Sequence, residues 1–134
     1  MKKILILSFF SLLFLASTCQ KEGEDCHRRI KIINNSTDSI IIAFKGYYGS
    51  SGLCNLAGSI LKTNDTYELT RNVCWESILA NGQSEEIYIV DPNNFNEPGA
   101  FYDCDSIEIK NTVLKLYVLS LEDLKKNKFT VTYP

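Results

Sequence analysis

Hydrophobic and polar positions divide this chain into an apolar leader and a series of short segments separated by polar turns. Residues 4–15 are apolar except for two serines, and Lys2 and Lys3 precede them. From residue 28 onward the apolar runs are short, and several alternate with polar residues in the period of two that indicates a β-strand with one buried face. The pattern therefore predicts a leader over residues 1–18 and a single β-rich domain over residues 28–134.

β-Branched and aromatic residues mark about seven segments as strands. The first two are joined by a polar turn over residues 34–38, and we expect them to form a pair. Residues 46–59, which are rich in Gly, Ser and Tyr, and the residues after Pro92 are predicted to be loops. The predicted strands are residues 30–33, 40–44, 65–70, 85–91, 107–109, 113–119 and 129–133. This set predicts a mainly β fold, a small antiparallel β-sandwich for which the immunoglobulin-like arrangement is one candidate.

Two stretches depart from the strand pattern and predict short helices. In "CWESILANG" the apolar residues Trp75, Ile78 and Leu79 are spaced as on one face of a helix, and an Asn-Gly pair provides a stop. In "SLEDLKK" Ser120 stands three residues before Asp123, which is a variant of the capping box that begins helices. We therefore expect one or two short helices beside the strands.

Charge excludes one class of partner. Without residues 1–18 the chain has 116 residues, with 12 Lys and Arg against 16 Asp and Glu, a net charge of −4. A mildly acidic domain without a basic stripe is a poor nucleic-acid binder. We therefore expect no nucleic-acid partner.

The leader ends at a cysteine. A basic start, an apolar run and the small residues 16–18 follow the order of a secretory signal peptide, and the run is shorter than the roughly 20 residues that span a membrane. The segment "ASTC" resembles the bacterial lipobox, although Ala16 stands where that motif usually has leucine. The resemblance implies that Cys19 becomes the first residue of the mature protein and carries more than one fatty chain, which anchors it firmly to a membrane.

The segment after Cys19 is acidic. Residues 20–25, "QKEGED", resemble the tether that directs lipoproteins of the Bacteroidota to the outer face of the outer membrane. The resemblance implies a lipidated tether over residues 19–27 and a location at the cell surface. A plain solvated linker is the alternative, because short charged runs are usually flexible and exposed.

Four further cysteines predict disulfides. With Cys19 lipidated, an even number remains in an oxidising compartment, and this favours two disulfide bonds. The candidates are Cys26, Cys54, Cys74 and Cys104. Three pairings are open, and we favour Cys54 with Cys74 and Cys26 with Cys104, because the first closes one local loop and the second ties the start of the domain to its later half.

Two further stretches carry a second resemblance. "CHRRIKIINNSTDSI", residues 26–40, and "LKLYVLSLEDLKKNKFTVTYP", residues 114–134, look like a group of small uncharacterised Bacteroidota lipoproteins. That group opens with an Asn-Asn hairpin and closes with a short helix and a strand ending in Tyr-Pro. The resemblance implies no activity.

Candidate catalytic and metal-binding residues are sparse. His27 is the only histidine, and its neighbour Cys26 would point to the opposite face of a strand, so we expect no Cys-His nucleophile pair. The cysteine gaps of 27, 19 and 29 residues lack the paired short spacing of a zinc site. We therefore expect no metal site, no cofactor and no enzyme activity.

One loop suggests binding. In "GYYGSSG" the faces of Tyr47 and Tyr48 could stack on sugar rings or on the apolar surface of a partner, and the surrounding Gly and Ser leave the loop adaptable. The alternative is that both tyrosines simply cover one end of the sandwich. We expect a membrane-anchored module that binds a glycan or a protein at the cell surface. A hydrolase with a carboxylate site hidden in the sequence, and a structural subunit of an envelope complex, remain the alternatives.

Overall fold

The computed structural model describes residues 22–45, 53–56, 60–94, 101–103 and 112–134. The described part is mainly strand, with two short α-helices and two 3-10 turns. The strands are β1 (Arg29–Asn34), β2 (Ile41–Lys45), β3 (Leu53–Leu56), β4 (Thr66–Thr70), β5 (Ser84–Val90), β6 (Phe101–Asp103), β7 (Val113–Ser120) and β8 (Thr130–Tyr133). The helical elements are α2 (Trp75–Ile78), η1 (Ala80–Gly82), η2 (Pro92–Asn94) and α4 (Leu121–Lys126).

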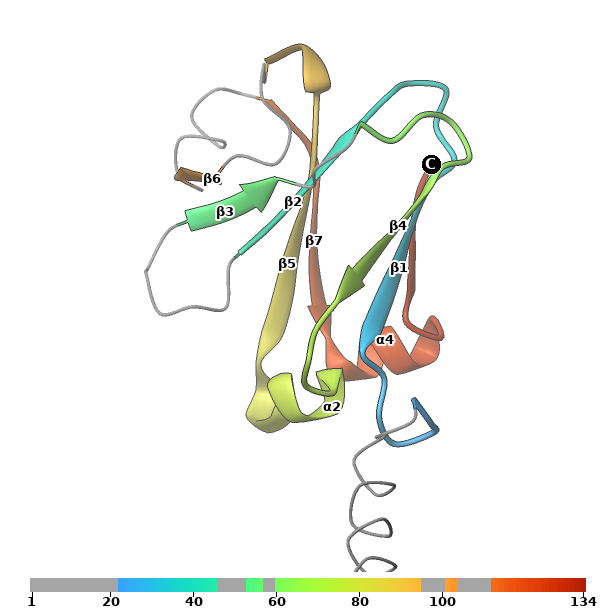
Figure 1. Ribbon diagram of the computed structural model, residues 1–134, viewed down its shortest axis with the longest axis vertical. Coiled ribbons are helices and arrows are strands. Elements are labelled where there is room, and N and C mark those ends of the chain that lie inside the picture. Colours follow the sequence, from blue (N-terminus) through green and yellow to red (C-terminus); the bar gives the residue numbers. More distant parts are fainter. Residues whose placement is uncertain (1–21, 46–52, 57–59, 95–100, 104–111) are drawn as a thin grey trace, which may run out of the picture.

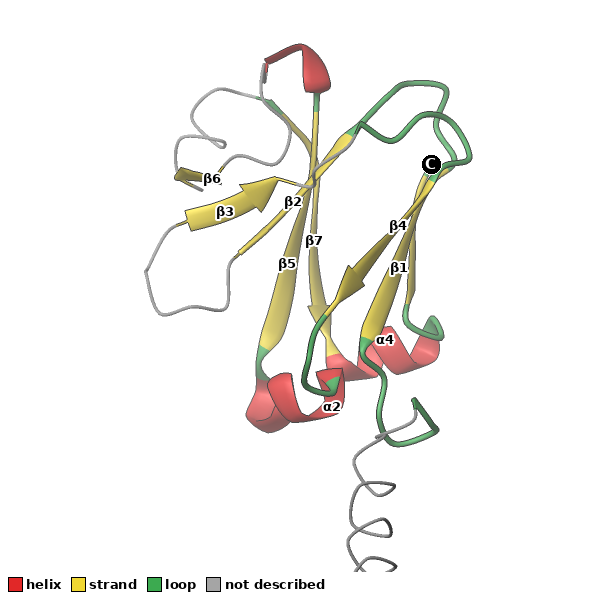
Figure 2. Cartoon of the chain, in the orientation of Figure 1, coloured by secondary structure: helices red, strands yellow, loops and turns green. Residues whose placement is uncertain are grey.

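The strands form two sheets that share one hydrophobic core (Figures 1 and 2). One sheet has the order β4-β1-β8 and the other has the order β6-β3-β2-β5-β7. Ile30 and Ile32 of β1 pack in the same cluster as Ile42 of β2 and as Ile87 and Ile89 of β5. This arrangement confirms the predicted mainly β, sandwich-like fold. Its immunoglobulin-like variant stays a prediction.

One strand pair departs from the expected antiparallel pattern. β1 pairs with β4 in the antiparallel sense, with Arg29 opposite Thr70, but it pairs with β8 in parallel, with Lys31 opposite Thr130. Because β1 and β8 run in the same direction, the start of β1 and the C-terminus lie at opposite ends of the domain (Figure 1).

The predicted hairpin between the first two strands is wrong. β1 belongs to the three-stranded sheet, whereas β2 pairs with β3 and β5 in the other. The chain crosses between the sheets after Asn34, whose fully buried side-chain amide donates to the carbonyl of Asp38 at 2.8 Å and to that of Leu61 at 3.1 Å. Ile40 then pairs with Leu61 as an isolated bridge. A buried amide with these backbone partners stabilises a crossover where the sequence predicts only a turn.

The C-terminal helix follows its sequence signal closely. The Ser120 side chain accepts the backbone N–H of Asp123 at 3.2 Å, and the Asp123 carboxylate accepts the backbone N–H of Ser120 at 3.0 Å. These reciprocal bonds satisfy donors that the first helical turn leaves without partners. The Ser120 hydroxyl, which donates to the Asp123 carboxylate at 2.6 Å, lowers the pKa of this exposed carboxyl, and the Ser120 backbone N–H lowers it further.

Two strands lie where loops are predicted. β3 falls within residues 46–59, and β6 follows Pro92. With four and three residues, respectively, both are too short to show a periodic pattern. The strand predicted over residues 107–109 lies outside the described residues. Among the described helices, none has the length and apolar character needed to cross a membrane.

Candidate functional site

The residues singled out from the sequence do not gather in one place. Cys19, Tyr47, Tyr48 and Cys104 lie outside the described residues. The backbone of Cys54 is placed in β3, opposite Tyr102 of β6. Cys26 and Cys74 lie together at the end of the domain where the chain enters, which is therefore the part in which a candidate site can be described.

The disulfide pairing favoured from the sequence is wrong, because Cys26 is bonded to Cys74, with a Cα–Cα distance of 5.0 Å. The reason is the antiparallel pairing of β1 with β4. This pairing brings the residues after β4 alongside those before β1, and Arg71 N–H donates to the carbonyl of Arg28 at 2.9 Å. Cys74 is thus carried to Cys26 by the strand register, and the bond closes a segment with a sequence separation of 48.

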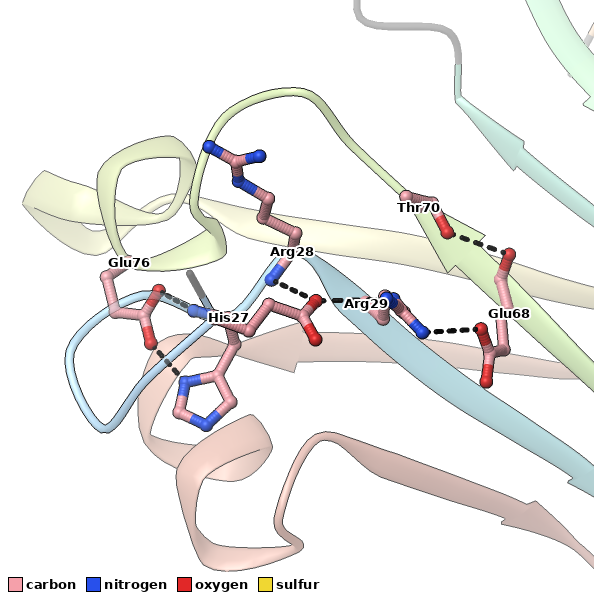
Figure 3. A network of polar contacts seen from close by, with 7 residues as sticks. His27, Arg28, Arg29, Glu68, Thr70 and Glu76 are labelled. Atoms are coloured by element: carbon pink, nitrogen blue, oxygen red, sulfur yellow. Dashed lines mark hydrogen bonds and ion pairs between the residues drawn. The ribbon is translucent and has the colours of Figure 1, made fainter. Parts of the chain in front are cut away.

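The residues that follow these two cysteines form a second link. The His27 backbone N–H donates to Glu76 Oε2 at 2.9 Å, and His27 Nδ1 lies 2.6 Å from Glu76 Oε1 (Figure 3). The Trp75 backbone N–H donates to the carbonyl of His27 at 2.8 Å. Burial alone would raise the pKa of Glu76, but the hydrogen bonds from His27 outweigh it and the net shift is downward.

An aromatic contact holds the His27 ring from one side. Its centroid lies 3.9 Å from that of Phe129, with an interplanar angle of 11°. Phe129 is 4% exposed and belongs to the core between α4 and β8. The segment that enters the domain is therefore fixed both to α2 and to the C-terminal part of the chain.

The acidic segment before Cys26 also contacts the domain. Backbone hydrogen bonds between Gly23 and Cys26 close a tight turn, with N–O distances of 3.2 and 3.1 Å. Glu22 accepts the backbone N–H of Arg28 at 3.3 Å and lies 3.4 Å from Arg29, which also pairs with Glu68 of β4 (Figure 3). These outer pairs are exposed, so each contributes little to stability. Residues 22–27 nevertheless follow a defined path along the domain.

A buried ion pair lies beneath this end. Arg71 Nη2 is 3.3 Å from Glu85 Oε1, and the Arg71 guanidinium carbon lies 5.3 Å from the ring centroid of Phe44 and 5.5 Å from that of Trp75. Burial raises the pKa of Glu85, and the Arg71 charge offsets this only in part. The pair links the loop after β4 to β5, and therefore links the two sheets.

The contacts of His27 and Glu76 hold the entering chain segment in place and do not leave the imidazole arranged for catalysis. A carboxylate that orients an imidazole is one component of a catalytic triad. Here, however, the same carboxylate also binds the backbone of His27, and Phe129 covers one face of the ring. Both contacts fix where the chain enters the domain. Among the described residues, no group of three His, Cys, Asp or Glu side chains could hold a metal ion.

Two open grooves flank α4. The larger, about 470 Å³, lies between η1 and α4 and is lined by Leu79, Asn81, Ser120, Leu121, Glu122 and Lys125 among others. The smaller, about 280 Å³, lies between β7, α4 and β8, and Asp123 is its one carboxylate. Neither groove brings two carboxylates together. The close carboxylate pair that a hydrolase of that kind needs is therefore not found in these grooves.

Apolar side chains are exposed along the outer face of β7. Leu114, Leu116 and Val118 are 46%, 40% and 56% exposed, and they alternate with the exposed Lys115, the half-buried Tyr117 and the buried Leu119. β7 is also the last strand of its sheet. An exposed apolar row on an edge strand is unusual in an isolated soluble domain.

Sequence reasoning missed His27 and Glu76 as partners because 49 residues separate them. A signal was nevertheless present, since each follows a cysteine within two positions, and a correct pairing of Cys26 with Cys74 would have brought them together. Comparison of the chain with protein-family models, curated proteins and solved structures gives no match in any of the three.

Proposed function

We propose that this protein is a bacterial lipoprotein whose Cys19 carries the lipid and whose β-rich domain is a binding or interaction module on the outer face of the outer membrane. The observation that supports this most is the position of Cys26. It lies seven residues after Cys19 and is covalently bonded to one end of the domain. The lipid would therefore hang from that end.

The length of the tether limits how far the domain stands from the membrane. Seven residues span at most about 25 Å when fully extended. The contacts of residues 22–27 with the domain shorten the free part further. The end that carries α2 and α4 would consequently face the membrane, and the opposite end would face outward (Figure 1).

The outward end offers ordered polar loops. Residues 35–39 and 62–65 lie there side by side, and the backbone of Asn34 joins them through hydrogen bonds with Asp65 at 3.0 Å and Asn64 at 2.6 Å. Exposed hydroxyl, amide and charged groups on fixed backbone suit recognition of a glycan or of a polar protein surface.

A structural subunit of an envelope complex is the second candidate. The exposed apolar row of Leu114, Leu116 and Val118 on the edge strand β7 favours it, because such a row is normally covered by a neighbouring molecule. In that case the contact would run along the side of the domain instead of its outward end.

Site-specific photo-crosslinking on intact cells tests the proposal and separates the two candidates. The crosslinking residue replaces Thr37 or Thr63 at the outward end, Leu116 on β7, or Glu122 at the opposite end as the matched control. A binding module predicts a shared crosslinked partner from Thr37 and Thr63 and none from Glu122. A partner captured only from Leu116 would favour the structural subunit. Crosslinking from Glu122 alone would contradict both.

A further inference from the structure

The two ends of the chain are joined through neighbouring strands. β1 follows the N-terminal segment directly, and β8 is the last strand before the C-terminus. They pair in parallel, from Lys31 opposite Thr130 to Asn34 opposite Tyr133. A force that pulls the start of β1 away from the end of β8 would slide one strand along the other. The cross-strand hydrogen bonds between them would then share the load, instead of breaking one after another.

β1 is also held on both sides within its sheet. It is the middle strand of its sheet and pairs with β4 over five positions, from Arg29 to Ile33. Its side chains Ile30 and Ile32 have no exposed surface. Removing β1 would therefore break two ladders and open the core at the same time.

The start of β1 is coupled to the second sheet. The Cys26–Cys74 bond passes part of any tension on the tether to α2, and the chain continues from α2 to β5 of the five-stranded sheet. The bonds of Glu76 with His27 follow the same route. Force from the anchor is thus divided between the two sheets.

The end of β8 is fixed to both sheets as well. The Asn35 backbone N–H donates to the carbonyl of Tyr133 at 2.8 Å, and the Tyr117 hydroxyl of β7 donates to the carbonyl of Thr132 at 3.0 Å. Since β7 belongs to the five-stranded sheet, β8 cannot slide past β1 without also leaving β7.

From these contacts we infer a further function: the domain resists tension between its N-terminal attachment and its opposite end, with β1 and β8 loaded in shear and the Cys26–Cys74 bond sharing the force between the sheets. This inference deepens the proposed function and rests on it for the source of the tension, which is a partner held at the outward end of an anchored protein. The resistance itself belongs to the domain.

Single-molecule force spectroscopy on the chain from Gln20 to Pro134 tests this. In one arrangement the handles are attached at the two ends. In the matched control the sequence is the same, but the second handle is attached at Lys128, an exposed residue just before β8 whose neighbour Phe129 stacks on His27 beside the N-terminal segment. The control pulls β8 away from β1 one hydrogen bond at a time. We expect a several-fold higher unfolding force between the chain ends than in the control, and equal forces would overturn the inference.

Two further arms probe the named contacts. Tyr117→Phe, which removes one hydroxyl and keeps the ring, should lower the force between the chain ends and leave the control force unchanged. In a Cys54→Ala/Cys104→Ala background, which leaves Cys26–Cys74 as the bond under test, reduction should add about 170 Å to the length released, the contour of the 48-residue separation. An unchanged length would contradict the role given to the bond. Because these pulls use unlipidated protein, a failure of lipidation at Cys19 would leave their outcome unaffected and would overturn only the proposed function.

Discussion

His27 Nδ1 lies 2.6 Å from Glu76 Oε1, directly beside the disulfide that joins Cys26 to Cys74. The two contacts fix the same chain segment, one covalently and one through hydrogen bonds. The segment is the one through which a lipid on Cys19 would be connected to the domain. This end of the molecule therefore combines the acidic tether expected from the sequence with a rigid attachment that the sequence does not predict.

Loss of the disulfide should be the most costly change at this end. On the chain-entropy model, a bond with a sequence separation of 48 stabilises the fold by about 4 kcal/mol. We expect the double variant Cys26→Ala/Cys74→Ala to lose about that much free energy of unfolding in urea titrations. Reductant should destabilise the parent by about that much more than it destabilises the double variant, which keeps only the Cys54–Cys104 bond predicted below. A parent that is indifferent to reductant would contradict this prediction.

Glu76 should contribute stability that depends on pH. Its pKa in the folded protein is lowered from 4.5, so the folded state holds the carboxylate in its charged form more strongly than the unfolded state does. This contribution is present above about pH 4.5 and is lost as the pH falls through the lowered value. Glu76→Gln should therefore be about 1 kcal/mol less stable than the parent at pH 7, and the two should converge in acid. Denaturation curves at several pH values measure this, and a constant difference down to pH 3 would argue against it.

Arg71 should be needed to keep Glu85 charged inside the domain. The Arg71 and Glu85 side chains are 18% and 9% exposed, and removing the cation leaves a buried carboxylate without its partner. We expect Arg71→Met to cost about 3 kcal/mol at neutral pH.

The cost of Arg71→Met should shrink in acid. Burial raises the pKa of Glu85 above 4.5, so its protonation favours the folded state and its ionisation opposes folding as the pH rises through the folded value. Glu85→Gln is the matched control, because it removes the charge and keeps the shape, and it should cost much less. Equal losses for Arg71→Met and Glu85→Gln at neutral pH would contradict this account.

The two remaining cysteines should form the second disulfide. With Cys26 bonded to Cys74, and with Cys19 lipidated as proposed, Cys54 and Cys104 are left. Cys54 pairs across the sheet with Tyr102, two positions before Cys104 in the sequence. Peptide mapping without reductant should recover a peptide that links them, and alkylation of both thiols in unreduced protein would refute the prediction.

The sequence was most informative where local chemistry decides the structure. The Ser120–Asp123 capping box and the alternation around Val131 predict α4 and β8 because both signals lie within a few neighbouring residues. The first hairpin failed for the opposite reason. A polar turn between two β-branched runs has the same sequence pattern whether the strands pair with each other or belong to different sheets. The crossover here depends on the hydrogen bond from the Asn34 side chain to the carbonyl of Leu61, which is 27 residues away in the sequence.

The candidate site was harder to predict for a related reason. The argument from loop length favours a bond between Cys54 and Cys74, whereas strand register brings Cys74 to Cys26. Register depends on which strands pair, and in this chain the first strand pairs with the fourth and the eighth. The His27–Glu76 contact follows from the same register and was therefore missed with it.

Mass spectrometry of the protein purified from its own cell membranes tests the central claim most directly. The account predicts an N-terminal peptide that begins at Cys19 and carries the added mass of a diacylglycerol on sulfur and of an acyl chain on the amino group. A peptide that still contains residues 1–18, or an N-terminal Cys19 without lipid, would contradict it.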